Sequence, residues 1–260
     1  MKHKPKAIIL DLDGTLLRSD KSISERTQKA LQECKKQGII IAVTTARFWF
    51  KAEQFLKVIE PDYALLADGT QIYQSGEMIH GFPMNRVQSD GIISELLKKG
   101  EGAEFVVSVG KMLLCSSLGI GENWRQTWDF REIPREPVYK IAAIMDSREE
   151  AKKLAEKYDC RMYAYRGESL YSFSGKAAGK YQAVLALGNI LGIAPDDMIA
   201  FGDDENDYEI LKYCGQGIAV ANAIPSVKEI ADEITDSNDE DGVAKYLEKY
   251  CLECSVHRVI

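Results

Sequence analysis

Short runs of mostly apolar residues recur along this chain, and several end directly in acidic or polar residues. The run 39–43 is unbroken, and similar runs cover 7–10, 62–67, 198–201 and 217–220. Runs of this kind are typical of strands that are buried on both faces. Segments with helical spacing separate them, so we predict an α/β fold in which a Rossmann-like parallel sheet carries helices on both faces.

Two segments show the helical spacing clearly. Residues 22–25 have the form of a capping box, and apolar residues follow at helical intervals until Gly38. A second helix is predicted to begin at Lys180 and to end at Gly192, because glycine is the residue that most often terminates a helix. Each predicted helix leads into one of the buried strands.

The middle of the chain has a different pattern. Amphipathic helices are predicted at 89–99 and 147–158, and shorter alternating strands at segments such as 104–109 and 139–145. We therefore expect an α+β domain formed by residues 83–174, inserted into an outer domain formed by residues 1–82 and 175–260.

Bulk properties exclude several classes of function. The chain has 260 residues and a net charge of −7, whereas proteins that bind nucleic acids or anionic membranes usually present clustered lysine and arginine. No apolar stretch approaches the ~18 residues that span a bilayer. We expect a cytoplasmic protein with no nucleic-acid partner and no membrane partner, and the oligomeric state stays open.

The six cysteines are scattered along the chain, which suits small buried side chains in a reducing compartment. Cys251 and Cys254, with His257 nearby, have the spacing of a metal or redox pair. No fourth ligand lies close in sequence, so we favour a tail without a designed site.

The first apolar run leads into Asp11-Leu12-Asp13-Gly14-Thr15. Side chains alternate along a strand, so Asp11 and Asp13 point the same way, and Gly14 permits a sharp turn. Two carboxylates this close cannot both stay ionised cheaply, so either one carries a proton or a cation lies between them. The alternative is an ordinary polar turn, in which aspartate and glycine are common.

A second acidic segment, 202–207, follows the strand 198–201. Its carboxylates would repel one another and the first pair unless a cation were bound, and oxygen ligands with room for water and phosphate suit Mg²⁺. Lys180 stands at a predicted helix start, where its charge is slightly unfavourable unless an anion is present. A phosphate would be attracted by both the lysine and the helix terminus.

Together these residues closely resemble the motifs of the haloacid dehalogenase (HAD) superfamily of phosphohydrolases. Residues 11–15 match the first motif, Thr45-Ala46-Arg47 the second, Lys180 the third and 202–207 the fourth. Two later segments, 218–223 and 239–244, resemble the Cof-like branch, whose members carry a type IIB cap between the second and third motifs. The insertion at 83–174 falls in that interval.

The resemblance implies a role for each matching residue. Asp11 is the nucleophile that forms an aspartyl-phosphate, and Asp13 is the acid that protonates the leaving alcohol and later the base that activates water. Thr45 and Lys180 bind the phosphoryl oxygens. Mg²⁺ is held by Asp11, the backbone carbonyl of Asp13, and Asp203, and the shell is completed or oriented by Asn206 and Asp207.

Some positions depart from the family pattern, which usually has glycine at Ala46 and Ala221 and asparagine at Asp68. A carboxylate at Asp68 would repel a neighbouring phosphate, so we do not predict a direct ligand role for it. Arg47 and Asn222 are candidate substrate contacts, although Arg47 would equally suit a pair with a core carboxylate. Candidates for specificity in the insertion are Arg125, Trp128, Tyr165 and Arg166.

The resemblance implies an Mg²⁺-dependent phosphatase that hydrolyses small phosphorylated metabolites, with sugar phosphates or similar compounds as the expected substrates. A sugar phosphomutase is the alternative within enzymes, because related proteins return the phosphoryl group to a sugar. A catalytically silent phosphate-binding regulator is the alternative from another class, and the presence of Asp11, Asp13, Lys180 and Asp203 argues against it.

Overall fold

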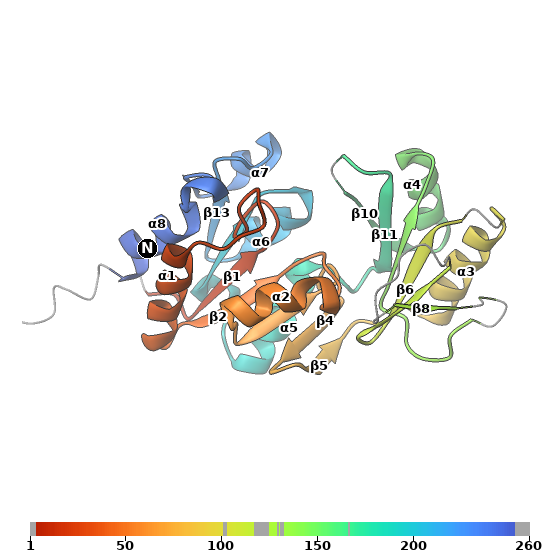
Figure 1. The fold of residues 1–260 in the computed structure, drawn as a ribbon, viewed down its shortest axis with the longest axis horizontal. Coiled ribbons are helices and arrows are strands. Elements are labelled where there is room, and N and C mark those ends of the chain that lie inside the picture. Colours follow the sequence, from red (N-terminus) through yellow and green to blue (C-terminus); the bar gives the residue numbers. More distant parts are fainter. Residues whose placement is uncertain are drawn as a thin grey trace, which may run out of the picture.

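The computed structural model describes residues 4–100, 103–116, 125–128, 130, 133–165 and 167–252. Two sheets organise these residues, and they lie next to each other along the long axis of the molecule (Figure 1). The chain forms most of the first sheet, crosses to build the second, and returns to complete the first. The active-site candidates lie where the two meet.

The first sheet has eight strands in the order β14-β13-β12-β1-β2-β3-β4-β5. Pairing is parallel from β14 to β3, and β4 and β5 extend the sheet in antiparallel fashion. The strands are β1 (Ala7–Asp11), β2 (Ile40–Thr44), β3 (Tyr63–Leu66), β4 (Gln71–Gln74), β5 (Glu77–Gly81), β12 (Met198–Gly202), β13 (Gln216–Val220) and β14 (Glu233–Thr235). The predicted parallel sheet is confirmed, with a β4–β5 hairpin that we did not predict.

Helices on two sides bury this sheet completely at its centre, where every residue of β1 and β12 is buried. Helix α1 packs against α2 and α8, and α6 packs against α5 and α7. The helices are α1 (Glu25–Lys36), α2 (Trp49–Ile59), α5 (Lys180–Leu191), α6 (Tyr208–Tyr213), α7 (Pro225–Ile230) and α8 (Gly242–Leu247). Gly192 ends α5 with a φ of 67°, as the sequence pattern predicted. The N-cap of α1 is Ser24, two residues after Ser22, where the predicted box 22–25 placed it.

The second sheet has six strands in the order β10-β11-β9-β6-β7-β8, all antiparallel to their neighbours except the β7–β8 pair. They are β6 (Phe105–Val109), β7 (Met112–Cys115), β8 (Arg125–Thr127), β9 (Lys140–Ile144), β10 (Cys160–Ala164) and β11 (Leu170–Gly175). Along β9 the side chains alternate: Ile141 and Ala143 enter a separate apolar core, whereas Lys140 and Ala142 face a cavity shared with the first sheet.

Two helices, α3 (Arg86–Leu97) and α4 (Arg148–Lys157), cover the apolar side of this second sheet. Helix α4 agrees with the predicted 147–158, with Ser147 as its N-cap. Helix α3 begins three residues earlier than predicted. Asn85 caps it and exchanges hydrogen bonds with Gln88, a reciprocal box that stabilises an earlier start.

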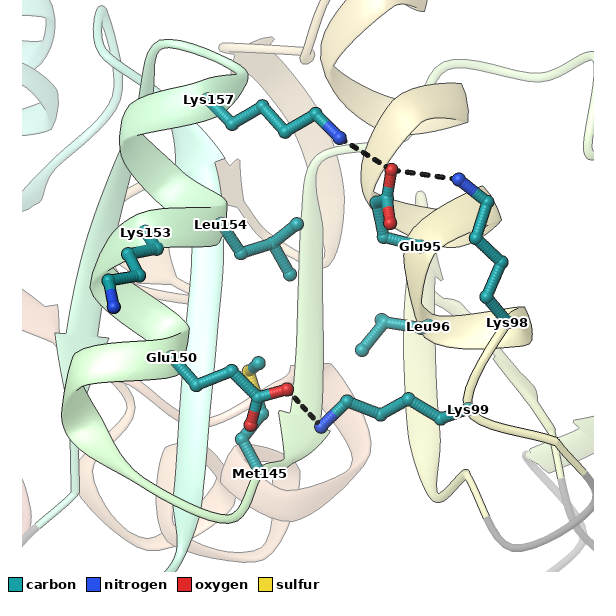
Figure 2. Close-up of a pocket in the computed structure, with 9 residues that line it drawn as sticks. All are labelled: Glu95, Leu96, Lys98, Lys99, Met145, Glu150, Lys153, Leu154 and Lys157. Carbon is teal, nitrogen blue, oxygen red and sulfur yellow. Dashed lines mark hydrogen bonds and ion pairs between the residues drawn. The ribbon is translucent and has the colours of Figure 1, made fainter.

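Ion pairs join α3 to α4 at the surface, above an apolar floor that includes Leu96 and Leu154 (Figure 2). Glu95 accepts hydrogen bonds from Lys157 at 2.7 Å and Lys98 at 3.0 Å, and these bonds lower the pKa of Glu95 to about 2. Lys99 lies 2.7 Å from Glu150. These contacts bridge the two helices across a pocket that both line. The second sheet with α3 and α4 is called the second body below, and the first sheet with its helices the first body.

Five cysteines in the described part of the chain are buried, as expected of small apolar side chains. They are Cys34, Cys115, Cys160, Cys214 and Cys251. Burial raises the pKa of the Cys34 thiol to about 12, which keeps it protonated. Cys254 and His257 lie outside the described residues. Within those residues no helix combines the length and apolar composition needed to cross a bilayer.

Candidate active site

A cavity of about 610 Å³ lies between the two sheets, at the carboxyl ends of the parallel strands. Its floor includes Asp11 at the end of β1, Thr45 just after β2 and Asp203 just after β12. The opposite wall comes from the second sheet and includes Lys140 and Tyr165. Ligands in open α/β sheets bind at this edge, so the cavity is the candidate site.

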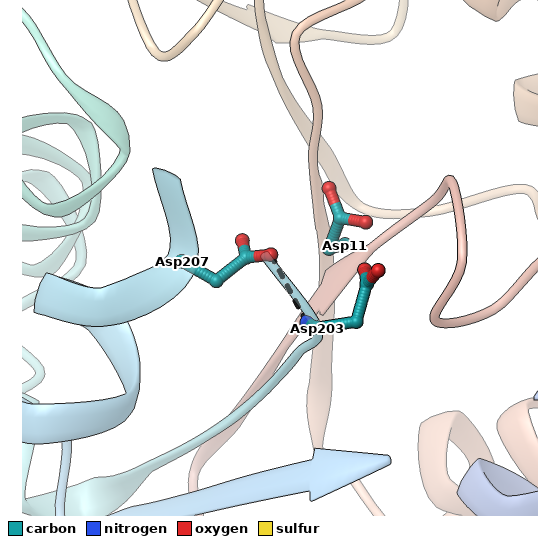
Figure 3. Close-up of side chains that lie close together, drawn as sticks. All are labelled: Asp11, Asp203 and Asp207. Atoms are coloured by element: carbon teal, nitrogen blue, oxygen red, sulfur yellow. Dashed lines mark hydrogen bonds between the residues drawn. The ribbon is translucent and has the colours of Figure 1, made fainter. Parts of the chain in front are cut away.

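Three carboxylates cluster at this edge of the sheet, and two of them, Asp11 and Asp203, line the cavity. One oxygen from each of Asp11, Asp203 and Asp207 lies within 4.8 Å of the others (Figure 3). Burial raises the pKa of Asp11 well above its ordinary range, and burial with the nearby charge of Asp207 raises the pKa of Asp203 to about 7. Ionisation of all three carboxylates is therefore unfavourable unless cations lie beside them.

Lys180, the first residue of α5, supplies one such cation. Its Nζ lies 2.6 Å from Oδ1 of Asp11 and 2.6 Å from Oδ1 of Asp207, with the side chain 1% exposed. Burial alone would lower the pKa of Lys180, but the charges of Asp11 and Asp207 outweigh it and raise the pKa. The lysine is therefore charged and fixed, and two of its three N–H donors are used.

The two oxygens of Asp207 are both occupied by the protein itself. Oδ1 accepts from Lys180, and Oδ2 accepts from the backbone N–H groups of Asp203 and Asp204 at 3.2 and 3.3 Å. Asp203 uses Oδ1 to accept a 2.8 Å bond from the Thr15 hydroxyl. Asp207 is thus arranged to hold the loop after β12, although one of its oxygens also lies in the cluster with those of Asp11 and Asp203.

Asp13 also lines the cavity, and two cationic side chains bind its carboxylate. Arg47 binds its carboxylate with both Nε and an Nη, at 2.6 and 2.7 Å, and Lys21 donates at 2.9 Å. Burial alone would raise the pKa of Asp13, but these bonds, those from Arg47 first, lower it below its ordinary value. Asp13 is therefore ionised in this arrangement.

Thr45 is buried immediately after β2, and its hydroxyl oxygen accepts a 3.2 Å bond from the backbone N–H of Arg47. The hydroxyl proton is left to donate into the cavity. Behind the loop, the Asp68 N–H donates to the Thr45 carbonyl at 3.0 Å, and the Ala67 N–H to the Arg47 carbonyl at 2.9 Å. The second motif is thus held by the turn that follows β3.

The two asparagine candidates lie in different surroundings. Asn206 lines the cavity, and its Nδ2 donates to Asp68 at 3.4 Å. Asn222 is not among the described residues that line the cavity. Its Nδ2 donates to the Gly14 carbonyl at 2.6 Å and its Oδ1 accepts from the Asn238 N–H, so it supports the turn after β1 from outside.

Of the four specificity candidates, Tyr165 lines the cavity, whereas Trp128 packs against the apolar core of the second body. The side chain of Arg125 and all of Arg166 lie outside the described residues. Sequence reasoning missed several residues that line the cavity wall, namely Lys21, Phe48, Lys51, Lys140, Glu168 and Leu170. For Lys140 and Leu170 the usable signal is strand alternation, because each faces away from the apolar core of its own sheet.

Thr15 is a further residue whose contact the sequence did not reveal, since its partner Asp203 comes from a distant motif. Gly14 belongs to the same contact. Its φ is +82°, and a Cβ there would lie 2.4 Å from a carboxylate oxygen of Asp203. The glycine therefore permits both the turn and the close approach of the acidic loop.

Comparison with known proteins gives matches that span nearly the whole chain. A 5-amino-6-(5-phospho-D-ribitylamino)uracil phosphatase, YitU of Bacillus subtilis, is 27% identical over 96% of this chain and 99% of its own length. The phosphoglycolate phosphatase of Methanopyrus kandleri is 26% identical over 95% and 97%. A haloacid dehalogenase-like hydrolase from Bacteroides thetaiotaomicron, known from its crystal structure, has a TM-score of 0.81 at 25% identity over 95% and 99%.

The family model of haloacid dehalogenase-like hydrolases matches residues 8–247, a range that includes all four motifs and the second sheet. This confirms the superfamily predicted from the motifs. The chain therefore belongs to the haloacid dehalogenase-like hydrolase family.

Proposed function

We propose that this chain is an Mg²⁺-dependent phosphatase that hydrolyses phosphate monoesters of small metabolites in the cytoplasm, through an aspartyl-phosphate on Asp11. The observation that carries the proposal is the surroundings of Asp11. One of its oxygens is bound by buried Lys180, and it stands on the cavity floor beside Asp203. A carboxylate so placed is a fixed nucleophile with a cation at hand.

The residues present fit a hard divalent cation. The donors are carboxylate oxygens, they are buried, and the raised pKa of Asp203 reports the cost of crowding them without a metal. Asp11, Asp203 and the backbone carbonyl of Asp13 would hold Mg²⁺, with Asn206 and Asp207 completing or orienting its shell. When bound, the ion supplies positive charge that offsets the repulsion between the Asp11 carboxylate and the phosphate.

The reaction then has two halves. An oxygen of Asp11 attacks phosphorus while the bond to the leaving oxygen breaks, and Asp13 gives that oxygen a proton. Thr45, through its hydroxyl, and Lys180, through its third N–H, stabilise the phosphoryl oxygens. In the second half Asp13 takes a proton from water, and the water oxygen attacks phosphorus while the bond between phosphorus and the Asp11 oxygen breaks. Phosphate leaves and the Asp11 carboxylate is restored.

Asp13 has to carry a proton in the first half of the reaction, and its contacts with Arg47 and Lys21 oppose protonation. Arg47 and Lys21 keep its pKa low in the present arrangement. A phosphate dianion entering the cavity competes with Asp13 for these cations, and we propose Arg47 as a substrate contact on this ground. Loss of those bonds would raise the pKa of Asp13 in the burial that remains. Asn222, which the structure holds outside the cavity lining, stays a lower-ranked candidate.

For the second body we propose the role of a cap, of type IIB, formed by residues 83–174 on a core formed by 1–82 and 175–260. The two named relatives act on different phosphate esters, so the leaving group varies within the family. The cavity wall that would contact the leaving group combines Phe48 and Lys51 of the core with Tyr165 and Glu168 of the second body. Small polar metabolites such as sugar phosphates suit a wall of mixed polarity.

The test compares wild-type protein with Asp11→Asn on a panel of phosphate monoesters in the presence of Mg²⁺. Wild-type protein is expected to release phosphate and the variant to release none above background, because the amide is not a nucleophile. Equal release by both proteins would show the proposal to be wrong. Formation of a phosphate isomer without free phosphate would indicate a mutase, and binding without either product a silent regulator.

A further inference from the structure

A buried ion pair joins the two bodies of the molecule at the cavity. Lys140, on β9 of the second sheet, lies with its Nζ 2.5 Å from Oδ2 of Asp68, which follows β3 of the first sheet. The side chains are 2% and 1% exposed. Removing two charges from water is costly, so a pair this deep requires close compensation from its surroundings.

The ammonium of Lys140 makes three contacts, one for each N–H that it has. They are Asp68, the Tyr165 hydroxyl at 2.7 Å and the backbone carbonyl of Ala46 at 2.9 Å. With its donors committed to the protein, Lys140 has none left for a substrate. Although Lys140 lies on the cavity wall, it therefore acts through the protein groups that it binds and not through the substrate.

The contact with Ala46 is the important one. Ala46 stands between Thr45 and Arg47, the residues proposed to bind the phosphoryl group and the substrate. The turn after β3 holds the two flanking carbonyls of this loop, through N–H groups of Ala67 and Asp68. Lys140 holds the middle carbonyl, so that all three successive carbonyls of the loop have a defined partner.

The turn after β3 is itself an unusual piece of backbone. Ala67 and Asp68 have φ values of 54° and 60°, in the left-handed region that non-glycine residues rarely adopt. Strain of this kind persists where the surroundings over-determine the backbone. Here the Asp68 carboxylate is bound by Lys140, by the Tyr165 and Ser172 hydroxyls and, more distantly, by Asn206.

We propose that Lys140 is a positioning residue through which the second body completes the phosphate-binding loop 45–47 of the first. The inference rests on the proposed function. Lys140 binds the Ala46 carbonyl, and Asp68 balances the charge of the lysine and fixes the turn that holds the loop. The Thr45 hydroxyl is therefore correctly placed only when the second body is docked on the first. Catalysis is sensitive to this placement because it depends on geometry at the ångström scale.

The test uses Lys140→Met, with Lys111→Met as a matched control. Lys111 also bridges the two bodies, with its Nζ 3.9 Å from the ring centroid of Trp49, but it is exposed and does not line the cavity. A third protein, Lys140→Met with Asp68→Asn, removes both charges of the pair. This double variant avoids a buried unpaired carboxylate, so it tests the loop even if the single variant fails to fold.

Three quantities are measured for each protein at saturating Mg²⁺: kcat and KM for p-nitrophenyl phosphate, and the inhibition constant of orthovanadate. The last reports the fit of the site to a five-coordinate phosphorus. We expect kcat to fall on the order of 100-fold in both Lys140 variants, as for a catalytic group displaced by about 1 Å. Vanadate inhibition should weaken with kcat, while Lys111→Met stays near wild type.

Thermal unfolding separates this role from a purely structural one. The double variant should recover melting temperature relative to Lys140→Met, since no unpaired charge remains, without recovering kcat or vanadate inhibition. Wild-type kcat and vanadate inhibition in the double variant, or equal effects of Lys140→Met and Lys111→Met, would overturn the inference. If Asp11→Asn hydrolysed the ester as fast as wild type, the proposed function itself would fail instead.

Discussion

The hydroxyl of Thr15 donates a 2.8 Å hydrogen bond to Oδ1 of Asp203, and both side chains are buried. The bond links the turn after β1 to the loop after β12 and fixes the orientation of one proposed metal ligand. Residues that orient metal ligands typically contribute 10- to 100-fold to metal affinity. The pair therefore gives a direct test of where the cation binds.

We predict that Thr15→Val weakens Mg²⁺ binding by about 10- to 100-fold, because valine keeps the shape of threonine but lacks the donor. The half-saturating Mg²⁺ concentration for phosphate release measures the effect. Thr15→Ser keeps the hydroxyl and serves as the control. An unchanged Mg²⁺ requirement in Thr15→Val would mean that Asp203 does not hold the ion in this orientation.

The raised pKa of Asp203 predicts how pH affects stability. Its pKa is about 7 in the folded metal-free protein, above the ordinary value for aspartate, so the folded state binds the proton more tightly than the unfolded state. The stabilisation is complete below about pH 4 and is lost as the pH rises through about 7. The free energy of unfolding of the metal-free protein should therefore decrease as the pH rises from about 4 to about 7.

Mg²⁺ should reverse this trend, because it binds the deprotonated carboxylates. We predict a larger increase in melting temperature on Mg²⁺ addition at about pH 8 than at about pH 5.5, where protons compete with the ion. Asp203→Asn should show little increase at either pH. A shift of equal size at both pH values in wild-type protein would contradict the assignment of the site.

Gly69 provides a prediction about the backbone that carries Lys180. Its φ is +77°, and a Cβ there would lie 2.4 Å from the Gly179 carbonyl oxygen, directly before α5. Gly38 has the same φ but nothing within 4 Å of such a Cβ. Gly38→Ala should therefore cost only the left-handed backbone strain, about 1–2 kcal/mol in the free energy of unfolding.

Gly69→Ala should cost more than Gly38→Ala, because backbone must also move to relieve the contact, which typically adds about 1–3 kcal/mol. It should also lower kcat, since α5 begins with Lys180. Denaturant unfolding and phosphate release measure the two effects. Similar unfolding free energies for the two variants would show that the turn after β3 relaxes without displacing α5.

The role proposed for Asp13 predicts a dependence on the leaving group. General acid catalysis contributes about 10²–10⁴-fold when the leaving oxygen is basic, and little when it is p-nitrophenolate. In rapid-quench experiments Asp13→Asn should retain a burst of p-nitrophenol but lose the corresponding first turnover with an alkyl phosphate. Equal losses on the two esters would argue that Asp13 acts only as a structural partner of Arg47.

The sequence predicted the parallel sheet well because its strands are uninterrupted apolar runs, whose meaning does not depend on distant residues. The end of α5 at Gly192 was also predicted from a local signal, whereas α1 is capped by Ser24 and not by Ser22, the first residue of the predicted box. The start of α3 was misplaced, because the helix begins at a box formed by Asn85 and Gln88 that precedes the apolar positions of the predicted 89–99. The β4–β5 hairpin was missed altogether.

The sequence by itself determined which residues are available for phosphoryl chemistry: Asp11, Asp13, Lys180 and Asp203 stand in local motifs at strand or helix ends, where backbone geometry dictates their direction. Only the tertiary structure decided their partners. In the folded chain Arg47 and Lys21 bind the Asp13 carboxylate, and both oxygens of Asp207 accept hydrogen bonds from the protein. Asn222 binds the Gly14 carbonyl in the turn after β1, and Lys140 forms an ion pair with Asp68. Hydrogen bonds and ion pairs act over a few ångströms between residues far apart in the chain, so they follow from packing and not from local pattern.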